Sequence, residues 1–289
     1  MRKLIVVLLV CFPLVSEAGG GWINEKYSWY LKFGQQWVNY NQYYNFDGIL
    51  TEDRTRSLGE TYIYAEYGMT NKLNAIVYLP FFSKATIFQQ VNTANGQIVQ
   101  DGESFSSIGD MNVSIKYGVL KEKLLVMSTT LTLGLPFGKT RKGTDQSLQT
   151  GDGEFNQMLS LDASSSFMLG KLKPYWSTYI GFNNRTEGFS DEVRYGIELG
   201  TSIRRWWFIL KSRAIKSLRN GNAGDNLFFN GLLLNNSEYI MVVPEIAYEF
   251  SENWGLSINY TKVVTGKLIF AQPAYSFSIY LNLSRNDHT

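Results

Sequence analysis

Ionisable side chains recur at alternate positions in several segments of this 289-residue chain. Arg194 and Glu198 are four residues apart, and Lys211 and Arg213 are two apart, so each pair would point to one side of an extended strand. The candidates on such a face are Lys32, Glu66, Lys116, Asp162, Arg194, Glu198, Lys211, Arg213 and Glu245. Charges of both signs on one face can form an ion-pair network that fills the interior, or can line a polar constriction that a solute crosses. The sequence leaves both roles open.

Catalytic chemistry has little support in the sequence. Hydrolysis by a Ser–His or Asp–His arrangement needs a histidine, and the single histidine, His288, is second from the C-terminus. The single cysteine, Cys11, lies in an apolar N-terminal run, so no His/Cys set is present for zinc. We therefore predict no catalytic residue, no metal site and no cofactor, and we do not expect an enzyme.

Two short stretches carry the oxygen ligands that calcium prefers. They are TGDGEFN at 150–156 and NGNAGDN at 220–226. Neither has the remaining ligands or the spacing of a calcium loop, and turn formation by Gly and Asn accounts for both. A basic loop, GKTRKG at 138–143, is either solvated or a contact for lipopolysaccharide phosphates.

Period-two alternation predicts that the charged candidates lie on β-strands. On both sides of a polar turn at 70–72, apolar residues occupy every second position, from Ile63 to Tyr67 and from Leu73 to Phe81. Twelve such segments are present: 26–37, 62–67, 73–81, 110–120, 124–137, 154–169, 175–182, 193–200, 206–213, 240–248, 254–261 and 275–284.

The links between these segments alternate in length. Short links are 70–72, 121–123, 170–173, 204–205 and 251–253. Most of the others are longer and rich in Gly, Asn, Asp and Ser: 43–58, 83–107, 138–152, 217–236 and 264–273, whereas 186–190 is brief. Alternating short and long links are typical of an outer-membrane barrel with short periplasmic turns and long extracellular loops.

A soluble β-sandwich is the alternative fold, but its strands usually have only five or six residues. Segments of about ten residues match a tilted strand that crosses hydrocarbon. Aromatic residues make up 15% of the chain and gather near segment ends, as interfacial girdles do. We predict an all-β fold, a transmembrane up-and-down antiparallel β-barrel of about twelve strands. Closure is required because an open edge in lipid would leave backbone groups unpaired.

The N-terminus has the form of an export signal. Arg2 and Lys3 precede the apolar run 4–15, and Ser16 and Ala18 are small residues at the positions that signal peptidase reads. We predict a signal peptide at 1–18 and a barrel at 19–289. The net charge of +2 gives no reason to expect a nucleic-acid partner.

Four motifs are similar to those of a known family. They are YGMTNKLNAIVYLPF, SIGDMNVSIKYGVL, LTLGLPFGKT and GDGEFNQMLSLDAS. Through them most of the chain after residue 18 resembles the outer-membrane family named for the meta pathway of phenol degradation. Ser107 stands where that family has a glycine, Phe137 replaces a common threonine, and the chain ends in a polar tail. The resemblance implies an outer-membrane barrel that takes up hydrophobic or aromatic compounds.

These observations predict an outer-membrane channel or uptake protein of a Gram-negative bacterium for small compounds, hydrophobic or aromatic ones included. Passage would be passive, through a polar lumen or by lateral exit through the wall. The alternative is a surface or structural barrel that acts through its extracellular loops, with 89–107 as the binding element. Expected partners are outer-membrane lipids, lipopolysaccharide, the barrel-assembly machinery and a small solute; the oligomeric state is left open.

Overall fold

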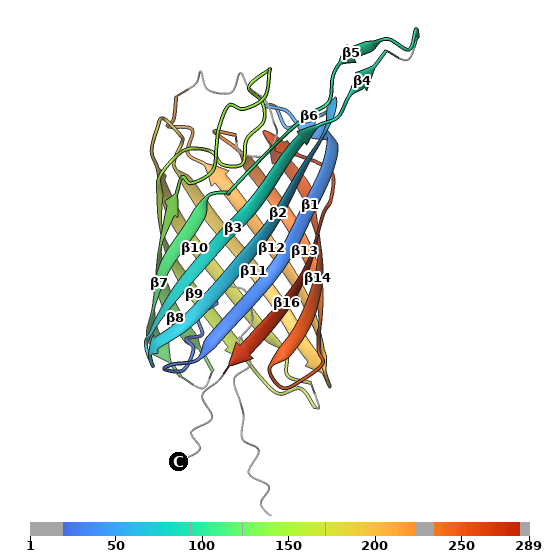
Figure 1. The fold of residues 1–289 in the computed structure, drawn as a ribbon. Coiled ribbons are helices and arrows are strands. Elements are labelled where there is room, and N and C mark those ends of the chain that lie inside the picture. The colour runs from blue at the N-terminus through green and yellow to red at the C-terminus, as the bar shows by residue number, and fades with distance from the viewer. Residues whose placement is uncertain (1–19, 93, 123, 171, 223–233, 284–289) are drawn as a thin grey trace, which may run out of the picture.

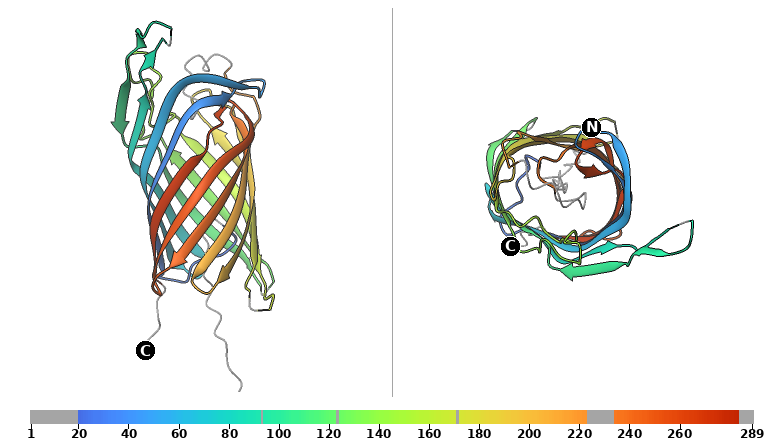
Figure 2. Two further views of the ribbon diagram at one scale, coloured as in Figure 1. Left: turned by 90° about the vertical axis from the view of Figure 1, so that its right-hand side faces the viewer. Right: turned by 90° about the horizontal axis from the view of Figure 1, so that it is seen from above.

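Strand pairing continues without a break around the whole molecule (Figures 1 and 2). The structure is a computed structural model, and it describes residues 20–92, 94–122, 124–170, 172–222 and 234–283. The predicted signal peptide at 1–18, Cys11 and His288 lie outside the described residues. Twelve long antiparallel strands form a closed barrel, and this confirms the predicted fold class.

The wall strands follow one another in chain order. They are β1 (Trp29–Tyr44), β2 (Leu50–Thr70), β3 (Leu73–Ile87), β7 (Met111–Lys121), β8 (Val126–Leu135), β9 (Asn156–Ser166), β10 (Tyr175–Arg185), β11 (Glu192–Ile203), β12 (Trp206–Ser217), β13 (Glu238–Glu249), β14 (Trp254–Lys267) and β16 (Ala274–Leu283). Four short strands lie at one end: β4 (Gln90–Val91), β5 (Ile98–Gln100), β6 (Glu103–Ser107) and β15 (Ile269–Phe270). Each of the twelve predicted segments overlaps one wall strand, although β2 and β14 are much longer than predicted.

The first wall strand closes the barrel. In β1, Phe33 lies opposite Ile63 of β2 and also opposite Ile279 of β16. Because β1 is paired on both sides, the wall presents no free strand edge, and backbone N–H and C=O groups inside the lipid layer are satisfied within the sheet. Closure therefore supplies the stability that a wall without cysteine cannot take from disulfides.

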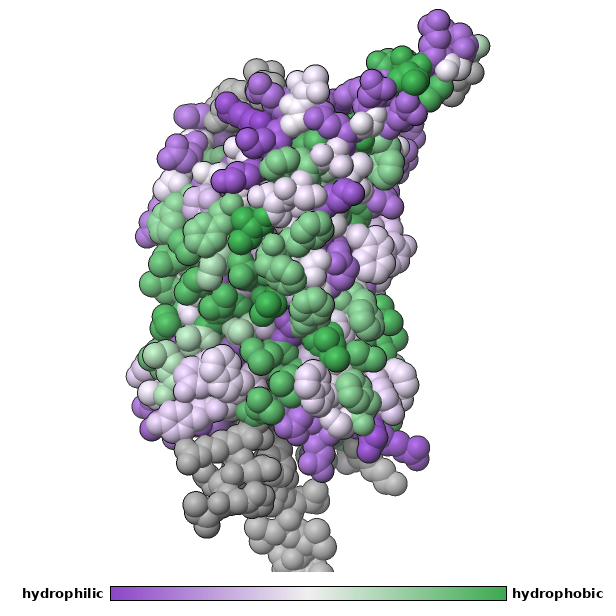
Figure 3. Space-filling view, in the orientation of Figure 1, coloured by the Kyte–Doolittle hydropathy of each residue, from purple (hydrophilic) through white to green (hydrophobic). Residues whose placement is uncertain are grey.

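On the face of the molecule shown in Figure 3, apolar side chains form a belt across the wall below a polar upper part. Phe33 of β1, Ile180 of β10 and Ile258 of β14 expose 50%, 57% and 60% of their surface, which is far more than core residues of a soluble protein would. Aromatic pairs lie near the strand ends, among them Trp29 with Tyr67. This belt, flanked by aromatic side chains, is the lipid-facing surface of a membrane barrel.

The inner face is packed by polar side chains and by tyrosine rings over glycines. A Cβ added at Gly34 would collide with the ring of Tyr62, and one at Gly200 would collide with Tyr175. Each ring thus occupies the space that a side chain on the neighbouring strand would take. The glycines keep the rings close to the wall, so the centre of the barrel stays hollow.

The orientation follows from the two ends of the barrel. Both described ends of the chain and the short turns lie at one end, whereas the β4–β5 arm projects from the other (Figure 1). Short turns and chain termini belong to the periplasmic side of such barrels, so the arm is extracellular.

Several links that were predicted as loops are largely strand. The segment 43–58 contains only one turn, at 45–49, because β1 and β2 continue pairing as far as Tyr44 and Leu50. Likewise β6 extends the ladder of β3, and β15 pairs with β1. The strands rise above the lipid, where both faces meet water and the alternation that marks a strand in the sequence disappears. The link 186–190 is brief, as predicted, and 217–236 is only partly described.

Candidate functional site

Described residues of the barrel interior line two adjoining cavities. The smaller, of about 320 Å³, lies mainly against β7–β12, and the larger, of about 580 Å³, lies mainly against β1–β3 and β12–β16. Three residues line both cavities: Tyr64, Lys211 and Arg213. The lumen therefore has two lobes that meet at the inward face of β12. Seven of the nine predicted residues line one or both lobes: Lys32, Asp162, Arg194, Glu198, Lys211, Arg213 and Glu245.

A chain of buried ion pairs runs along one side of this lumen. Lys211 Nζ lies 2.7 Å from Glu245 Oε2 on β13 and 3.7 Å from Glu198 Oε2 on β11. Glu245 Oε1 in turn lies 3.6 Å from Lys32 Nζ on β1. All four side chains are at most 7% exposed, so their charges compensate one another instead of being solvated.

Arg194 does not join this network, although it shares a strand and a face with Glu198. Its Nη2 lies 2.7 Å from Glu192 Oε2, two residues earlier in β11. Glu198 instead accepts a hydrogen bond of 2.6 Å from the hydroxyl of Tyr175. Within one strand, spacing places side chains on the same face but does not select their partners; strand register and side-chain reach do.

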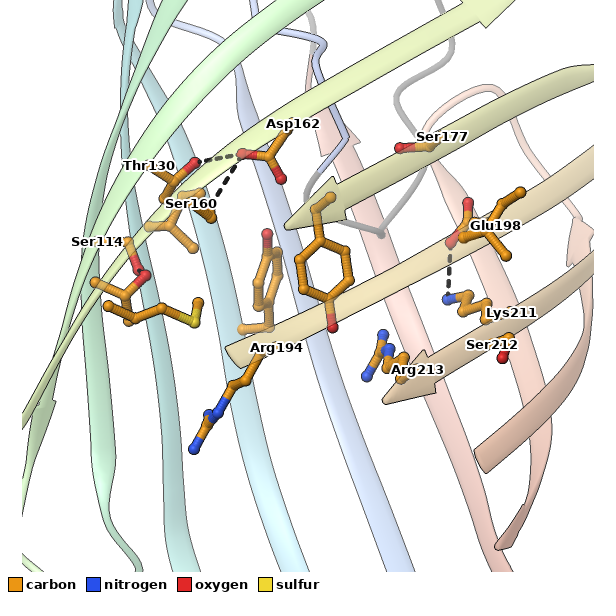
Figure 4. Close-up of a pocket in the computed structure, with 16 residues that line it drawn as sticks. Ser114, Thr130, Ser160, Asp162, Ser177, Arg194, Glu198, Lys211, Ser212 and Arg213 are labelled. Carbon is orange, nitrogen blue, oxygen red and sulfur yellow. Dashed lines mark hydrogen bonds and ion pairs between the residues drawn. The ribbon is translucent and has the colours of Figure 1, made fainter. Parts of the chain in front are cut away.

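The remaining predicted residues, Glu66, Lys116 and Asp162, lie on the other side of the lumen, and the two carboxylates accept hydrogen bonds from neutral side chains. Glu66 accepts a hydrogen bond of 2.6 Å from Asn74 Nδ2, and Asp162 accepts one of 3.1 Å from Thr130 Oγ1 (Figure 4). Lys116 is 2% exposed on β7. Glu66 and Lys116 are thus buried against the wall and are not among the residues that line the two cavities.

The N-terminal segment, defined here as residues 20–28, lies inside the barrel (Figure 2). The amide of Gly21 donates a hydrogen bond of 2.8 Å to Ser164 Oγ on β9, and Trp22 packs edge-on against Tyr175 on β10 at 5.7 Å between ring centroids. Its path ends at the start of β1, where the amide of Tyr27 donates to the carbonyl of Gly68. This segment therefore follows the inner wall of the periplasmic mouth.

Small residues in the wall make room for this segment. A Cβ added at Gly68 of β2 would collide with the carbonyl of Glu25, and one at Gly118 of β7 would lie 2.9 Å from Ile23. The N-terminal segment has no period-two alternation, so the sequence pattern does not predict it. Two features of the sequence could have indicated it. A glycine run directly follows the predicted cleavage site, and Gly and Ser occupy inward positions on five strands, where they leave room for a segment inside the barrel.

A cluster of carboxylates surrounds Arg185 at the extracellular end of β10. The three guanidinium nitrogens of Arg185 lie 2.6 Å from Glu154 Oε1, 2.8 Å from Glu192 Oε1 and 2.9 Å from Asp152 Oδ2. Asp110 lies beside them and accepts hydrogen bonds from the amide of Asp152 at 2.8 Å and from the amide of Gly138 at 2.9 Å. The cluster fastens the link 138–152 to the barrel.

More carboxylates than cations are buried in this cluster, and this affects their protonation. Burial raises the pKa of Asp152 to about 6; the nearby charge of Asp110 adds to the effect, and Arg185 opposes it. Burial likewise raises the pKa of Asp110 and of Glu154. Below about pH 6, protonation of Asp152 therefore stabilises the attachment of the link 138–152 to the barrel.

We expect the barrel to be more stable at pH 5 than at pH 7.5, in part through Asp152. Its folded pKa lies above its ordinary value, so its contribution is complete below the ordinary pKa and is lost as pH rises through about 6. The difference from this residue is about 1 kcal/mol between the two pH values. Thermal unfolding in detergent should show that Asp152→Asn reduces this pH dependence.

Asp191 provides the matched control for that prediction. Hydrogen bonds from Asn220 and from the amide of Arg185 lower its pKa, so its charge state does not change between pH 5 and pH 7.5. Asp191→Asn should retain the pH dependence of the wild type. Equal pH dependence in Asp152→Asn and the wild type would contradict the assignment.

Of the two stretches considered for calcium, the first forms an ion-paired turn and the second is only partly described. In the first, Asp152 and Glu154 are bound to Arg185, and Gly153 has φ of 78° in a turn. In the second, Asp225 lies outside the described residues. Among the described residues no group of three or more His, Cys, Asp or Glu side chains could hold a metal ion. The same part of the chain contains no helix that is long and apolar enough to span a membrane.

Comparison with known proteins identifies solved structures with a similar fold. No protein family matches the sequence, and no curated protein matches it. Among solved structures, an outer membrane channel from Pseudomonas putida F1 has 12% identity and a TM-score of 0.61, covering 93% of this chain and 100% of its own. The KdgM porin (6% identity, TM-score 0.48) and the translocator domain of the autotransporter NalP from Neisseria meningitidis (9% identity, TM-score 0.48) also match. They cover 88% and 89% of this chain, and 99% and 88% of their own lengths.

The closed antiparallel wall, its apolar belt and the first of these structural similarities all indicate the same fold. The protein is a transmembrane β-barrel of the outer membrane.

Proposed function

We propose that the protein is an outer-membrane channel for the passive passage of small solutes. The observation that carries the proposal is the hollow interior, whose two lobes meet at Tyr64, Lys211 and Arg213. A barrel that served only as an anchor would not need an interior hollow lined by hydroxyl, amide and charged groups. The N-terminal segment narrows the periplasmic mouth and would limit the size of the solute.

Axial passage fits the wall better than lateral exit. Lateral exit needs an opening between strands through which an apolar solute could reach lipid. In the described wall each strand pairs with both neighbours, and the lobes offer a solute polar groups such as those of Thr130, Ser160 and Asn259. The route proposed here therefore leads through the lumen.

The class of solute is part of the proposal. The resemblance to the family named for the meta pathway of phenol degradation suggests small aromatic compounds. Support from the molecule itself comes from tyrosine rings in both lobes, among them Tyr64, Tyr78 and Tyr179, since an aromatic solute can pack against such rings.

Liposome swelling tests the proposal directly. Vesicles that contain the full chain should admit small uncharged and charged solutes faster than vesicles without protein, with rates that fall as solute size increases. A matched sample of protein heated to destroy the barrel serves as control. Swelling equal to that of empty vesicles for every solute would reject the channel.

A surface role is the second candidate, and one observation favours it. The arm formed by β4 and β5 leaves the barrel at its extracellular rim and exposes Val91, Ile98 and Val99 (Figure 1). Deletion of 90–101 is a clean test, because a Cβ at Gly102 would lie 3.1 Å from the amide nitrogen of Gln89, so the two ends are already adjacent. The channel function predicts unchanged swelling; loss of cell-surface binding with unchanged swelling would favour the second role.

A further inference from the structure

Arg213 differs from the other charged side chains of the lumen. Lys32, Lys211, Glu198 and Glu245 compensate one another, and Arg194 is paired with Glu192. Arg213, by contrast, makes no hydrogen bond and no ion pair with any residue that the structure describes. Its side chain is exposed to the lumen, where it lines both lobes. A guanidinium without a carboxylate is available to a solute.

The wall around Arg213 is shaped to leave this guanidinium accessible. Its neighbour on β11 is Gly196, which has no side chain, and its neighbour on β13 is Met241, which has no charge. A Cβ at Gly196 would lie 2.7 Å from the ring of Tyr179, so that ring occupies the space beside Arg213. Figure 4 shows Arg213 next to the Glu198–Lys211 pair, on the inward face of β12.

The pairing of the charges that line the lobes, and not their number, sets Arg213 apart. The smaller lobe is lined by three cations (Arg194, Lys211 and Arg213) and two anions (Asp162 and Glu198). The larger lobe is lined by Lys32, Lys211 and Arg213, against Glu60 and Glu245. Lys211 and Arg213 line both lobes, so the two linings together hold four cations and four anions. Lys211 is held by two glutamates and Arg194 by Glu192, so Arg213 is the cation that faces both lobes without a carboxylate partner among the described residues. A low-dielectric wall concentrates the field of such an unpaired charge within the lumen.

The surroundings of Arg213 also provide apolar contact. Tyr78, Tyr179 and Tyr239 all lie within electrostatic reach of the guanidinium, and Ile76, Met158 and Val243 add aliphatic surface to the lobes. A guanidinium binds a carboxylate through two parallel hydrogen bonds, which an ammonium cannot match in geometry. Tyrosine rings beside it can pack against a flat or apolar body.

We infer that Arg213 is the anion-recognition residue of the lumen, and that the barrel binds small monocarboxylates with an apolar body in preference to neutral or cationic molecules of the same size. For transport this inference rests on the proposed channel function, but for binding it does not. Arg213 holds the carboxylate where the two lobes meet, and the tyrosine rings hold the body of the solute.

Equilibrium dialysis of the full chain in detergent tests binding with three matched probes: benzoate, benzyl alcohol and benzylamine. Protein-free micelles give the background for partition into detergent. The wild type should bind benzoate at least about tenfold more tightly than either other probe at low ionic strength, where electrostatic differences are largest. Arg213→Gln should remove this preference, and Arg213→Lys should retain part of it.

Arg219→Gln is the matched control, because it removes the same charge from a half-exposed residue that pairs with Glu238 near the extracellular end. It should bind benzoate as the wild type does. Equal binding of the three probes by the wild type, or an unchanged preference in Arg213→Gln, would overturn the inference.

Current through planar bilayers separates failure of this inference from failure of the channel function. In a tenfold KCl gradient the reversal potential of the wild type should indicate anion selectivity, and that of Arg213→Gln should move toward cation selectivity. If the wild type carries no current, the channel function fails while the dialysis result still decides the binding site. Current without anion selectivity would overturn the inference alone.

Discussion

Deletion of residues 20–24 should raise the single-channel conductance about twofold or more, because a twelve-strand lumen is narrow and the deleted backbone lies inside it. The N-terminal segment follows the inner wall from Gly68 on β2 to Ser164 and Ser177 on β9 and β10. It therefore lines about half the circumference of the periplasmic mouth. Its removal leaves the wall strands and their hydrogen bonds intact, so the barrel should still fold and still resist unfolding by detergent.

Two variants make this prediction specific. Gly68→Ala introduces a Cβ that collides with the carbonyl of Glu25, so it should displace the segment and raise conductance without shortening the chain. Gly59→Ala, on the same strand, is the matched control, because a Cβ there would meet its nearest atom only at 3.8 Å. Conductance in the deletion variant that equals the wild-type value would show that the narrowest part of the lumen lies elsewhere.

The position of the segment can be tested independently of conductance. A Cβ at Gly20 would lie 2.7 Å from Ser164 Oγ, a separation suited to a disulfide between cysteines placed at these positions. Cys11 is the only native cysteine and lies in the predicted signal peptide, so no other thiol would compete in the mature chain. A variant with Gly20→Cys and Ser164→Cys should oxidise to a cross-linked form that is detected by its mass and is reversible by reductant.

The strands were predictable from sequence because the lipid imposes a strict alternation. Where one face meets lipid and the other meets the lumen, as between Tyr275 and Leu283 of β16, apolar and more polar residues alternate and the strand is evident. Above the lipid both faces meet water, and this is why the paired residues within 43–58, such as Tyr43 and Thr51, are predicted as part of a long loop. The extent of the extracellular strands therefore could not be obtained from the pattern.

The charged residues of the inner face were found for the same reason, but their partners were not. Sequence spacing places Arg194 and Glu198 together, yet Arg194 pairs with Glu192 and Glu198 with Lys211 and Tyr175. The partners depend on strand register, which a single sequence does not specify. The N-terminal segment escaped prediction because it has no periodicity, and only the wall residues opposite it reveal its path.

Loss of one member of the buried ion-pair chain should be among the most destabilising changes in the lumen. Glu245 is 2% exposed and lies 2.7 Å from Lys211 and 3.6 Å from Lys32. Glu245→Gln removes the carboxylate that lies between two buried ammonium groups. We expect this to lower the free energy of unfolding by about 3–5 kcal/mol. Denaturant unfolding in detergent measures this directly.

An exposed ion pair on the same strand as Lys211 shows how much of the expected cost is due to burial. Lys216 pairs with Glu238 at 2.6 Å, but its side chain is 58% exposed, so Lys216→Met should cost less than about 1 kcal/mol. Lys211→Met should cost several times more, and the double variant Lys211→Met with Glu245→Met should cost less than the sum of its single variants, because opposite charges are removed together. Equal costs for Lys211→Met and Lys216→Met would contradict the compensated network.

The same variants distinguish the two roles that the sequence left open for these charges. If the network mainly fills the interior, Lys211→Met should admit solutes that the wild type excludes, and swelling rates should rise for every solute of small size. If it forms a constriction that selects solutes, swelling should fall for the selected solute and stay constant for the others. We expect the first result, because four side chains that are at most 7% exposed are held by one another and have little surface left for a passing solute. Recognition of the solute then falls to Arg213, which is exposed to both lobes.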